Sequence, residues 1–117
     1  MTISERRVGD VTLLEPAGRL VFGDGDDELR ADLNRLVAEG RLKIILSLKN
    51  VSYIDSCGVG LLAAKFASVR RLGGDLRLLW LSPRSQRVLT ISGLINIFQI
   101  FDGEPAAVAS FGREGPA

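Results

Sequence analysis

Residues 42–60 read LKIILSLKNVSYIDSCGVG, and this stretch decides the fold. Its first seven residues are almost continuously apolar, which is typical of a central strand covered on at least one face. The residues from about Gly58 to Leu72 then predict a helix that ends at Gly73-Gly74. The apolar stripe of this helix consists of Val59, Leu62, Phe66 and Val69.

Working outward, the same kinds of signal predict strands alternating with helices. A strand at Ile3–Val8 pairs through a Gly9-Asp10 turn with a strand at Val11–Leu14, which Pro16–Gly18 ends. The other predicted elements are a helix at Asp26–Glu39, a strand at Leu76–Leu81, a helix at Pro83–Ile91 with Ser82 as N-cap, a strand at Ile97–Phe101 and a helix at Glu104–Phe111.

This order indicates one α/β domain, residues 1–112, followed by a frayed tail, residues 113–117. We expect a mixed sheet of four or five strands with helices packed mainly on one face. The helices at Asp26–Glu39 and Gly58–Leu72 should pack together there, and Trp80 and the phenylalanines should belong to the core.

The composition excludes several classes of function. The net charge of +1 gives no reason to expect nucleic acid or an anionic membrane as a partner. The chain has no histidine and a single cysteine, Cys57, so a Cys/His nucleophile pair, the usual zinc sites and an internal disulfide are ruled out. No signal peptide is visible at Met1–Gly9 and no apolar run is long enough to span a membrane, so we expect a cytoplasmic protein.

The charges are unevenly placed along the chain. Six basic residues and one acid, Asp75, lie between Lys65 and Arg87, whereas residues 24–28 hold four acids and no base. Two interpretations stay open: these are two solvated faces, or an acidic loop and a basic face that help to choose a partner.

The segment before the second helix places polar groups at a helix N-terminus. Asp55 or Ser56 is expected to be the N-cap, and Ser56 and Cys57 lie where unpaired N–H groups and the helix dipole tolerate an anion. Gly58 and Gly60 let the backbone bend and leave the surface open. Spacing alone favours a simple cap and turn here.

The sequence resembles the STAS domain family, and within it the bacterial anti-sigma factor antagonists, over nearly all of its length. The resemblance rests on Gly18, Ile45–Leu48, Val51–Gly60, Gly73-Gly74 and Ile91–Leu94.

The resemblance implies that Ser56, directly after Asp55, is phosphorylated by an anti-sigma factor that is also a serine kinase. The unphosphorylated form would bind that kinase and release a sigma factor, and a phosphatase would restore it. ATP and magnesium would belong to the kinase, so no cofactor, no catalytic residue and no enzyme activity are expected of this chain, which would be a monomer or weak homodimer.

The sequence departs from the family pattern at two positions. Gly18-Arg19-Leu20-Val21 lacks the aspartate usual at Val21, and Cys57 stands where Ser or Thr is usual. An alternative function is therefore an unphosphorylated STAS scaffold in a stress-signalling or transporter complex. A hydrolase that uses Ser56 is disfavoured because no second base accompanies it.

The expected partner surface extends from this segment along one side of the second helix. It comprises Asp55, Ser56, Cys57, Gly58, Gly60, Ala64, Ala67 and Arg71. Equally, the side formed by the last four could pack on a neighbouring helix of the same chain. Cys57 is expected to be a small, partly buried structural residue, with a redox sensor as the alternative.

Overall fold

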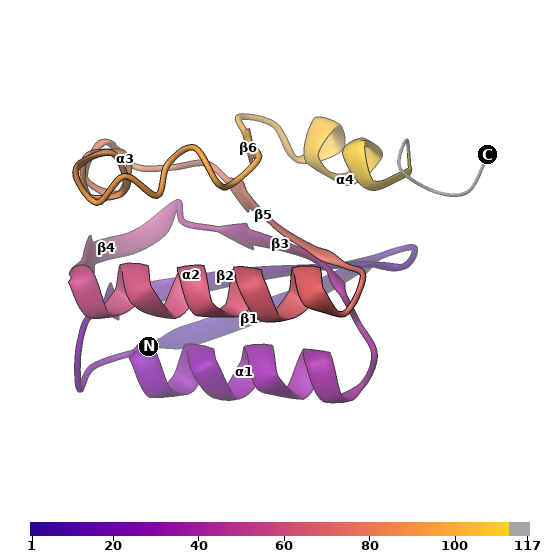
Figure 1. Cartoon of the computed structure of the whole chain (residues 1–117), viewed down its shortest axis with the longest axis horizontal. Helices are drawn as coiled ribbons and strands as arrows, with labels where there is room; N and C mark the ends of the chain where they lie inside the picture. The colour runs from indigo at the N-terminus through magenta and orange to yellow at the C-terminus, as the bar shows by residue number, and fades with distance from the viewer. Residues whose placement is uncertain (113–117) are drawn as a thin grey trace.

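The computed structural model describes residues 1–112, so the predicted tail at 113–117 lies outside the described residues. The elements in chain order are β1 (Thr2–Val8), β2 (Val11–Leu20), α1 (Asp26–Ala38), β3 (Lys43–Ser47), β4 (Asn50–Ile54), α2 (Ser56–Arg71), β5 (Asp75–Leu79), α3 (Pro83–Ile91), β6 (Ile100–Phe101) and α4 (Glu104–Gly112). The α/β alternation is confirmed (Figure 1).

The sheet is mixed, as expected. Its order is β1-β2-β3-β5-β6, and β4 pairs with the second half of β2. Only the β1–β2 pair is antiparallel among the described strands. The sheet has six strands rather than four or five, because β4 was not predicted: only Val51 and Ile54 of its five residues are buried.

The β1–β2 hairpin has the predicted two-residue turn, since Val8 pairs with Val11 and Gly9 has a φ of 62°. The prediction that β2 ends at Pro16 is wrong, because the strand continues to Leu20. The pairing with β3 covers residues 12–14 of β2 and the pairing with β4 covers residues 17–20. Pro16 falls between these two ladders, where a residue without an N–H interrupts neither.

Helices α1 and α2 lie side by side on one face of the sheet, which we call the front face (Figure 1). The main core forms between them and the strands, and Leu33, Leu46 and Leu62 in it are fully buried. The predicted stripe of α2 is confirmed, with Phe66 half-buried at its edge against Phe98. Helix α3 has its predicted bounds, and Ser82 caps it by accepting the Ser85 N–H.

Helix α4 covers the opposite face, which we call the back face. A smaller apolar cluster there consists of Val11, Leu13, Ile45, Leu79, Ala107 and Phe111. Arg77 is fully buried beside it, so the expectation that Arg77 forms part of a basic surface is wrong. Its guanidinium donates to Asp75 (2.9 Å) and to Ser110 Oγ (2.7 Å), and lies 4.1 Å from the centroid of the Phe111 ring.

Candidate functional site

The site is built where β4 ends and α2 begins. Asp55 is the N-cap of α2, since its Oδ1 accepts the Gly58 N–H at 3.0 Å. Its Oδ2 accepts the Phe22 N–H at 3.1 Å. These backbone donors, Gly58 first, hold the pKa of the Asp55 carboxyl below its usual range. Of the two candidate caps, the structure therefore selects Asp55 and makes Ser56 the first residue of the helix.

A hydrogen bond and a close backbone contact join the end of β2 to the start of α2. The backbone N–H of Asp55 donates to the Leu20 carbonyl at 3.4 Å. A Cβ on Gly58 would lie 2.4 Å from the same carbonyl oxygen, so only glycine permits this approach. Gly58 is buried, and the expectation of an open surface holds only for Gly60, where a Cβ would meet no other atom within 4 Å.

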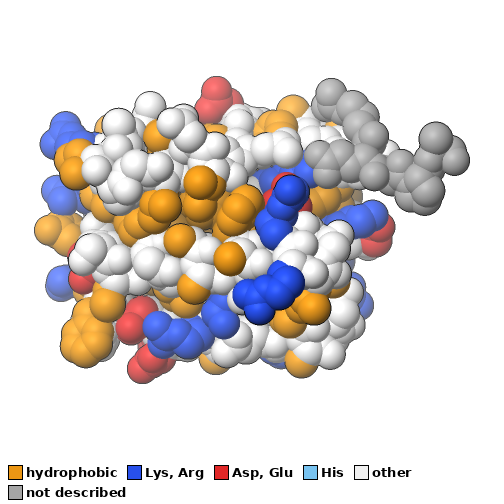
Figure 2. All heavy atoms as spheres, viewed as in Figure 1, with side chains coloured by type: hydrophobic (Ala, Val, Ile, Leu, Met, Phe, Trp, Pro, Cys, Tyr) orange, Lys and Arg blue, Asp and Glu red, His pale blue; other side chains and the backbone are white. Residues whose placement is uncertain are grey.

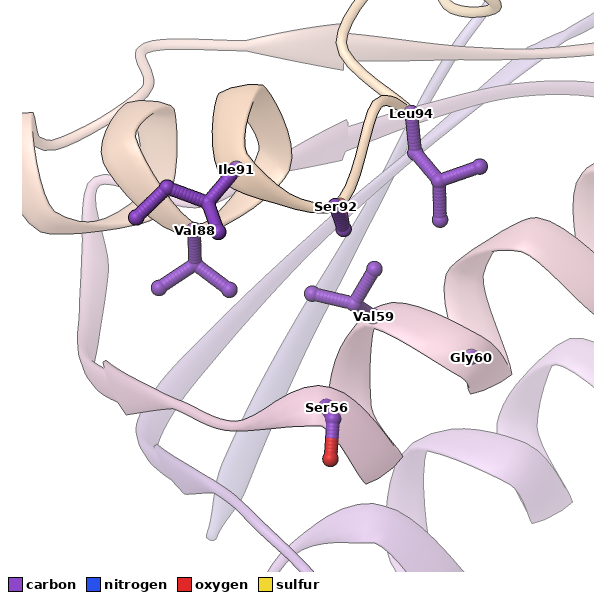
Figure 3. Close-up of a pocket in the computed structure, with 7 residues that line it drawn as sticks. All are labelled: Ser56, Val59, Gly60, Val88, Ile91, Ser92 and Leu94. Atoms are coloured by element: carbon purple, nitrogen blue, oxygen red, sulfur yellow. The ribbon is translucent and has the colours of Figure 1, made fainter.

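Ser56 is exposed and lines a groove of about 350 Å³ between α2 and the end of α3. The groove is lined by Ser56, Val59, Gly60, Val88, Ile91, Ser92 and Leu94. Figure 3 shows the Ser56 side chain on the first turn of α2, with its hydroxyl directed away from the α3 side chains. Ile91 is 80% exposed, so an apolar side chain stands in solvent across the groove from the serine.

The expected partner surface on α2 is open to solvent. Gly60, Ala64, Ala67 and Arg71 are all exposed. The alternative, that this side packs on a neighbouring helix of the chain, is wrong, because α1 meets α2 on another side, where Lys65 donates to Asn34. Figure 2 shows apolar side chains gathered between α2 and the segment after α3.

Two residues differ from their predicted environment. Cys57 is an exposed free thiol rather than a partly buried residue. Phe22 is 78% exposed rather than part of the core. It sits on a tight turn in which Val21 and Asp24 exchange two backbone hydrogen bonds of 3.0 Å. The signal in the sequence was the Gly23-Asp24-Gly25 run, which favours a turn directly after this phenylalanine.

A third feature, on β4, was not predicted at all. Two guanidinium groups lie near the half-exposed ring of Tyr53. That of Arg84 is 4.4 Å from the ring centroid and that of Arg19 is 5.9 Å from it. Two cations are thus held close to the strand that leads into Ser56. Among residues 1–112, no three His, Cys, Asp or Glu side chains come together as a metal site would need.

The fold and the site define a class of small α/β protein that presents a serine at the start of a helix beside an apolar groove. The STAS domain family model matches residues 2–107, and the chain belongs to this family.

Named relatives agree with this membership. The anti-sigma F factor antagonist of Paenibacillus polymyxa is 35% identical over 65 residues. That alignment spans 56% of this chain and 56% of the relative, a little over half of its length. A candidate anti-sigma factor antagonist of Thermotoga maritima has a solved structure with a TM-score of 0.85 and 26% identity, covering 92% of each chain.

The cell fate determinant SpoIIAA of Bacillus, solved in its phosphorylated form, has a TM-score of 0.74 and 23% identity. The match covers 94% of this chain and 99% of SpoIIAA, and it supports the fold. None of the helices among residues 1–112 combines the length and the apolar character that crossing a membrane requires.

Proposed function

We propose that this protein is an anti-sigma factor antagonist whose binding is switched by phosphorylation of Ser56. In its unphosphorylated form it binds an anti-sigma factor that is also a serine kinase, and a sigma factor is released. The observation that carries the proposal is the placement of an exposed Ser56 on the first turn of α2, at the mouth of an apolar groove. Membership of the STAS family and the likeness to the Paenibacillus antagonist support it.

A phosphate on Ser56 would act through charge. It adds about −1.5 to −2 charges at neutral pH. The N-terminus of α2 supports an anion, but the cap position is already held by the ionised Asp55. In the free protein the phosphate remains hydrated, because Ser56 is exposed. Against a partner the phosphate must lose water, and a like charge placed opposite it across the interface costs several kcal/mol.

A cost of this size in the free energy of binding is large enough for a switch. A change from 1:99 to 99:1 in bound fraction requires about 5.5 kcal/mol of differential affinity. One phosphate in a tightly packed interface supplies a large part of that, so no change of fold is required. The exposed small residues Gly60, Ala64 and Ala67 let the partner backbone approach α2 closely, with Arg71 at the far end.

The chain itself performs no reaction in this proposal. The partner kinase binds ATP and magnesium and transfers the phosphate, and a phosphatase removes it. The protein acts in the cytoplasm, where the sigma factor is. An ester-hydrolysis screen of the purified protein should find no activity that Ser56→Ala removes.

Incubation with the partner kinase and ATP tests the switch directly. One phosphate should be added, Ser56→Ala should abolish it, and Ser52→Ala, which alters another exposed serine nearby, should not. Affinity for the kinase should fall in the order unmodified protein, Ser56→Asp, phosphorylated protein, since aspartate carries one charge and a shorter reach. Phosphate on a different residue, or wild-type affinity for Ser56→Asp, would refute the switch.

Cys57 gives a second check on the same surface. Cys57→Ser should leave partner binding nearly unchanged, because serine fills a similar volume at this exposed position. A large loss of binding, or oxidant sensitivity that this change removes, would instead assign the thiol a redox role.

One observation favours a second function, an unphosphorylated scaffold. Valine stands at position 21, where the family pattern has an aspartate, so the turn has no carboxylate at that point, and the Val21 side chain is buried instead. A pull-down from the source cell with wild type and Ser56→Asp separates the two functions. A scaffold would retain the same partners with both proteins.

A further inference from the structure

A second cavity, of about 510 Å³, lies at the carboxyl ends of the parallel strands β3, β5 and β6. It is lined by Lys49, Trp80, Leu81, Ser82 and Asp102 and shares no residue with the groove at Ser56. In open α/β sheets, ligands bind in crevices outside the carboxyl ends of strands. The cavity therefore lies where a small molecule is expected and where the proposed switch has no role.

Trp80, at the end of β5, is held in an unusual conformation. Its φ of 56° is the one positive value among the non-glycine residues described. Its backbone N–H donates to the Phe101 carbonyl (3.0 Å) and its indole N–H to the Asp102 carbonyl (2.6 Å). A left-handed conformation is strained for a bulky residue, and such strain gathers at binding sites. Trp80 packs partly against the apolar cluster of the back face and also lines the cavity.

Two residues of opposite charge, Lys49 and Asp102, line the cavity. The Lys49 ammonium lies 5.1 Å from the centroid of the Trp80 ring. Within the described part of the chain, neither Lys49 nor the Asp102 carboxylate has an oppositely charged side chain within 4 Å. The two charges are thus both available to a ligand. The Ser82 hydroxyl is already engaged at the start of α3.

We propose that this cavity is a binding site for a small zwitterion of the amino-acid type with an aromatic or apolar side chain. Its carboxylate pairs with Lys49, its ammonium group pairs with Asp102, and its side chain packs on Trp80 and Leu81. An anion alone would meet the Asp102 carboxylate, and a cation alone would meet Lys49. A ligand with both charges matches both groups. This inference is independent of the proposed switch.

Trp80 makes the site directly measurable, because it is the sole tryptophan of the chain. Titration with L-phenylalanine, which does not absorb where indole is excited, should change the fluorescence of Trp80 in a saturable way. Phenylacetate and phenethylamine each lack one of the two charges and should bind about tenfold more weakly or worse. Chemical shifts of the Trp80 indole N–H give a second readout if the fluorescence is insensitive.

Substitutions at Lys49 and Asp102 test the role of each charge in binding. Lys49→Met and Asp102→Asn should each weaken binding of L-phenylalanine about tenfold. Lys43→Met, which removes a lysine that pairs with Asp10 at the hairpin, should leave it unchanged. The proposal is overturned if neither readout saturates at millimolar ligand. Equal binding of the three ligands, or unchanged binding by both cavity variants, also overturns it.

Discussion

The two faces of the sheet are stabilised in different ways. The front face packs leucine and isoleucine side chains against α1 and α2 in one continuous apolar core. The back face has a smaller apolar cluster under α4, with the paired charges of Arg77 and Asp75 buried beside it. Apolar burial depends on volume and tolerates similar shapes, whereas a buried ion pair requires both partners.

The contrast has a functional side. The front face of the sheet packs against α2, the helix that carries Ser56, and its role at that site is structural. The back-face cluster packs against Trp80, which also lines the second cavity together with the charged residues Lys49 and Asp102. Substitutions on the two faces should therefore lower the free energy of unfolding for different reasons.

The largest effect is expected at the buried ion pair. Arg77→Met should lower the free energy of unfolding by about 3–5 kcal/mol, because it leaves Asp75 buried with its nearest cation, Arg70, at 3.8 Å. Urea unfolding followed by circular dichroism measures this. The double variant Arg77→Met with Asp75→Asn should recover part of the loss, and a double variant less stable than the single one would contradict this account.

On the front face, Leu62→Ala should lower the free energy of unfolding by about 2–5 kcal/mol, since it opens a cavity in a fully buried position. The matched control is Leu72→Ala, at a leucine that is 56% exposed, where the loss should be within about 0.5 kcal/mol. Leu62→Met should cost less than about 1.5 kcal/mol because volume is nearly conserved. Equal losses at Leu62 and Leu72 would refute a volume-dependent front core.

Smaller effects are expected at the start of α2. Asp55→Ala should cost about 0.5–2 kcal/mol through loss of the N-cap. The folded pKa of Asp55 is below its unfolded value, so the charge contributes stability above the unfolded pKa. That contribution is lost as pH falls through the folded pKa. The stability difference between wild type and Asp55→Asn should accordingly shrink in acid, and a difference that grows in acid would contradict the cap assignment.

The smallest effect is expected at the proposed switch itself. Ser56→Ala should change the free energy of unfolding by no more than about 0.5 kcal/mol, because Ser56 is exposed and is not the cap. Ser82→Ala, at the serine that does cap α3, should cost about 0.5–2 kcal/mol. If the two alanine variants lose the same stability, Ser56 has a structural role that the proposed switch does not include.

Much of the fold could be predicted, because the buried residues of its main elements form a recognisable apolar pattern in the sequence. The continuous apolar run of β3 and the stripe of α2 mark elements covered by others, and Ser82-Pro83 marks the start of α3. β4 escaped prediction because an edge strand with two buried residues has too little apolar pattern to be recognised. The end of β2 was predicted wrongly at Pro16, because the position of this residue between two ladders depends on how the strands pair and cannot be recognised from the local sequence.

The site was predictable in position but not in its contacts. The motif placed Asp55 and Ser56 at a helix start, yet the choice of cap depends on where the Gly58 N–H points. The Gly23-Asp24-Gly25 run indicates the turn at Phe22, but not that the Phe22 N–H donates to Asp55, 33 residues away in the chain. Arg77 looked like a surface charge because nothing in its own strand indicates that α4 will cover it.

The cover over Arg77 is formed by α4, which follows every other described element in chain order. Ser110 and Phe111 emerge more than thirty residues after the strand they shield, so a nascent chain that has already assembled the front face still holds an uncovered cation and bare apolar strands at the back. Such exposed surfaces are recognised by chaperones and proteases. A copy of this domain that lacks α4 is therefore expected to be bound or degraded more readily than one in which α4 has closed over the back face.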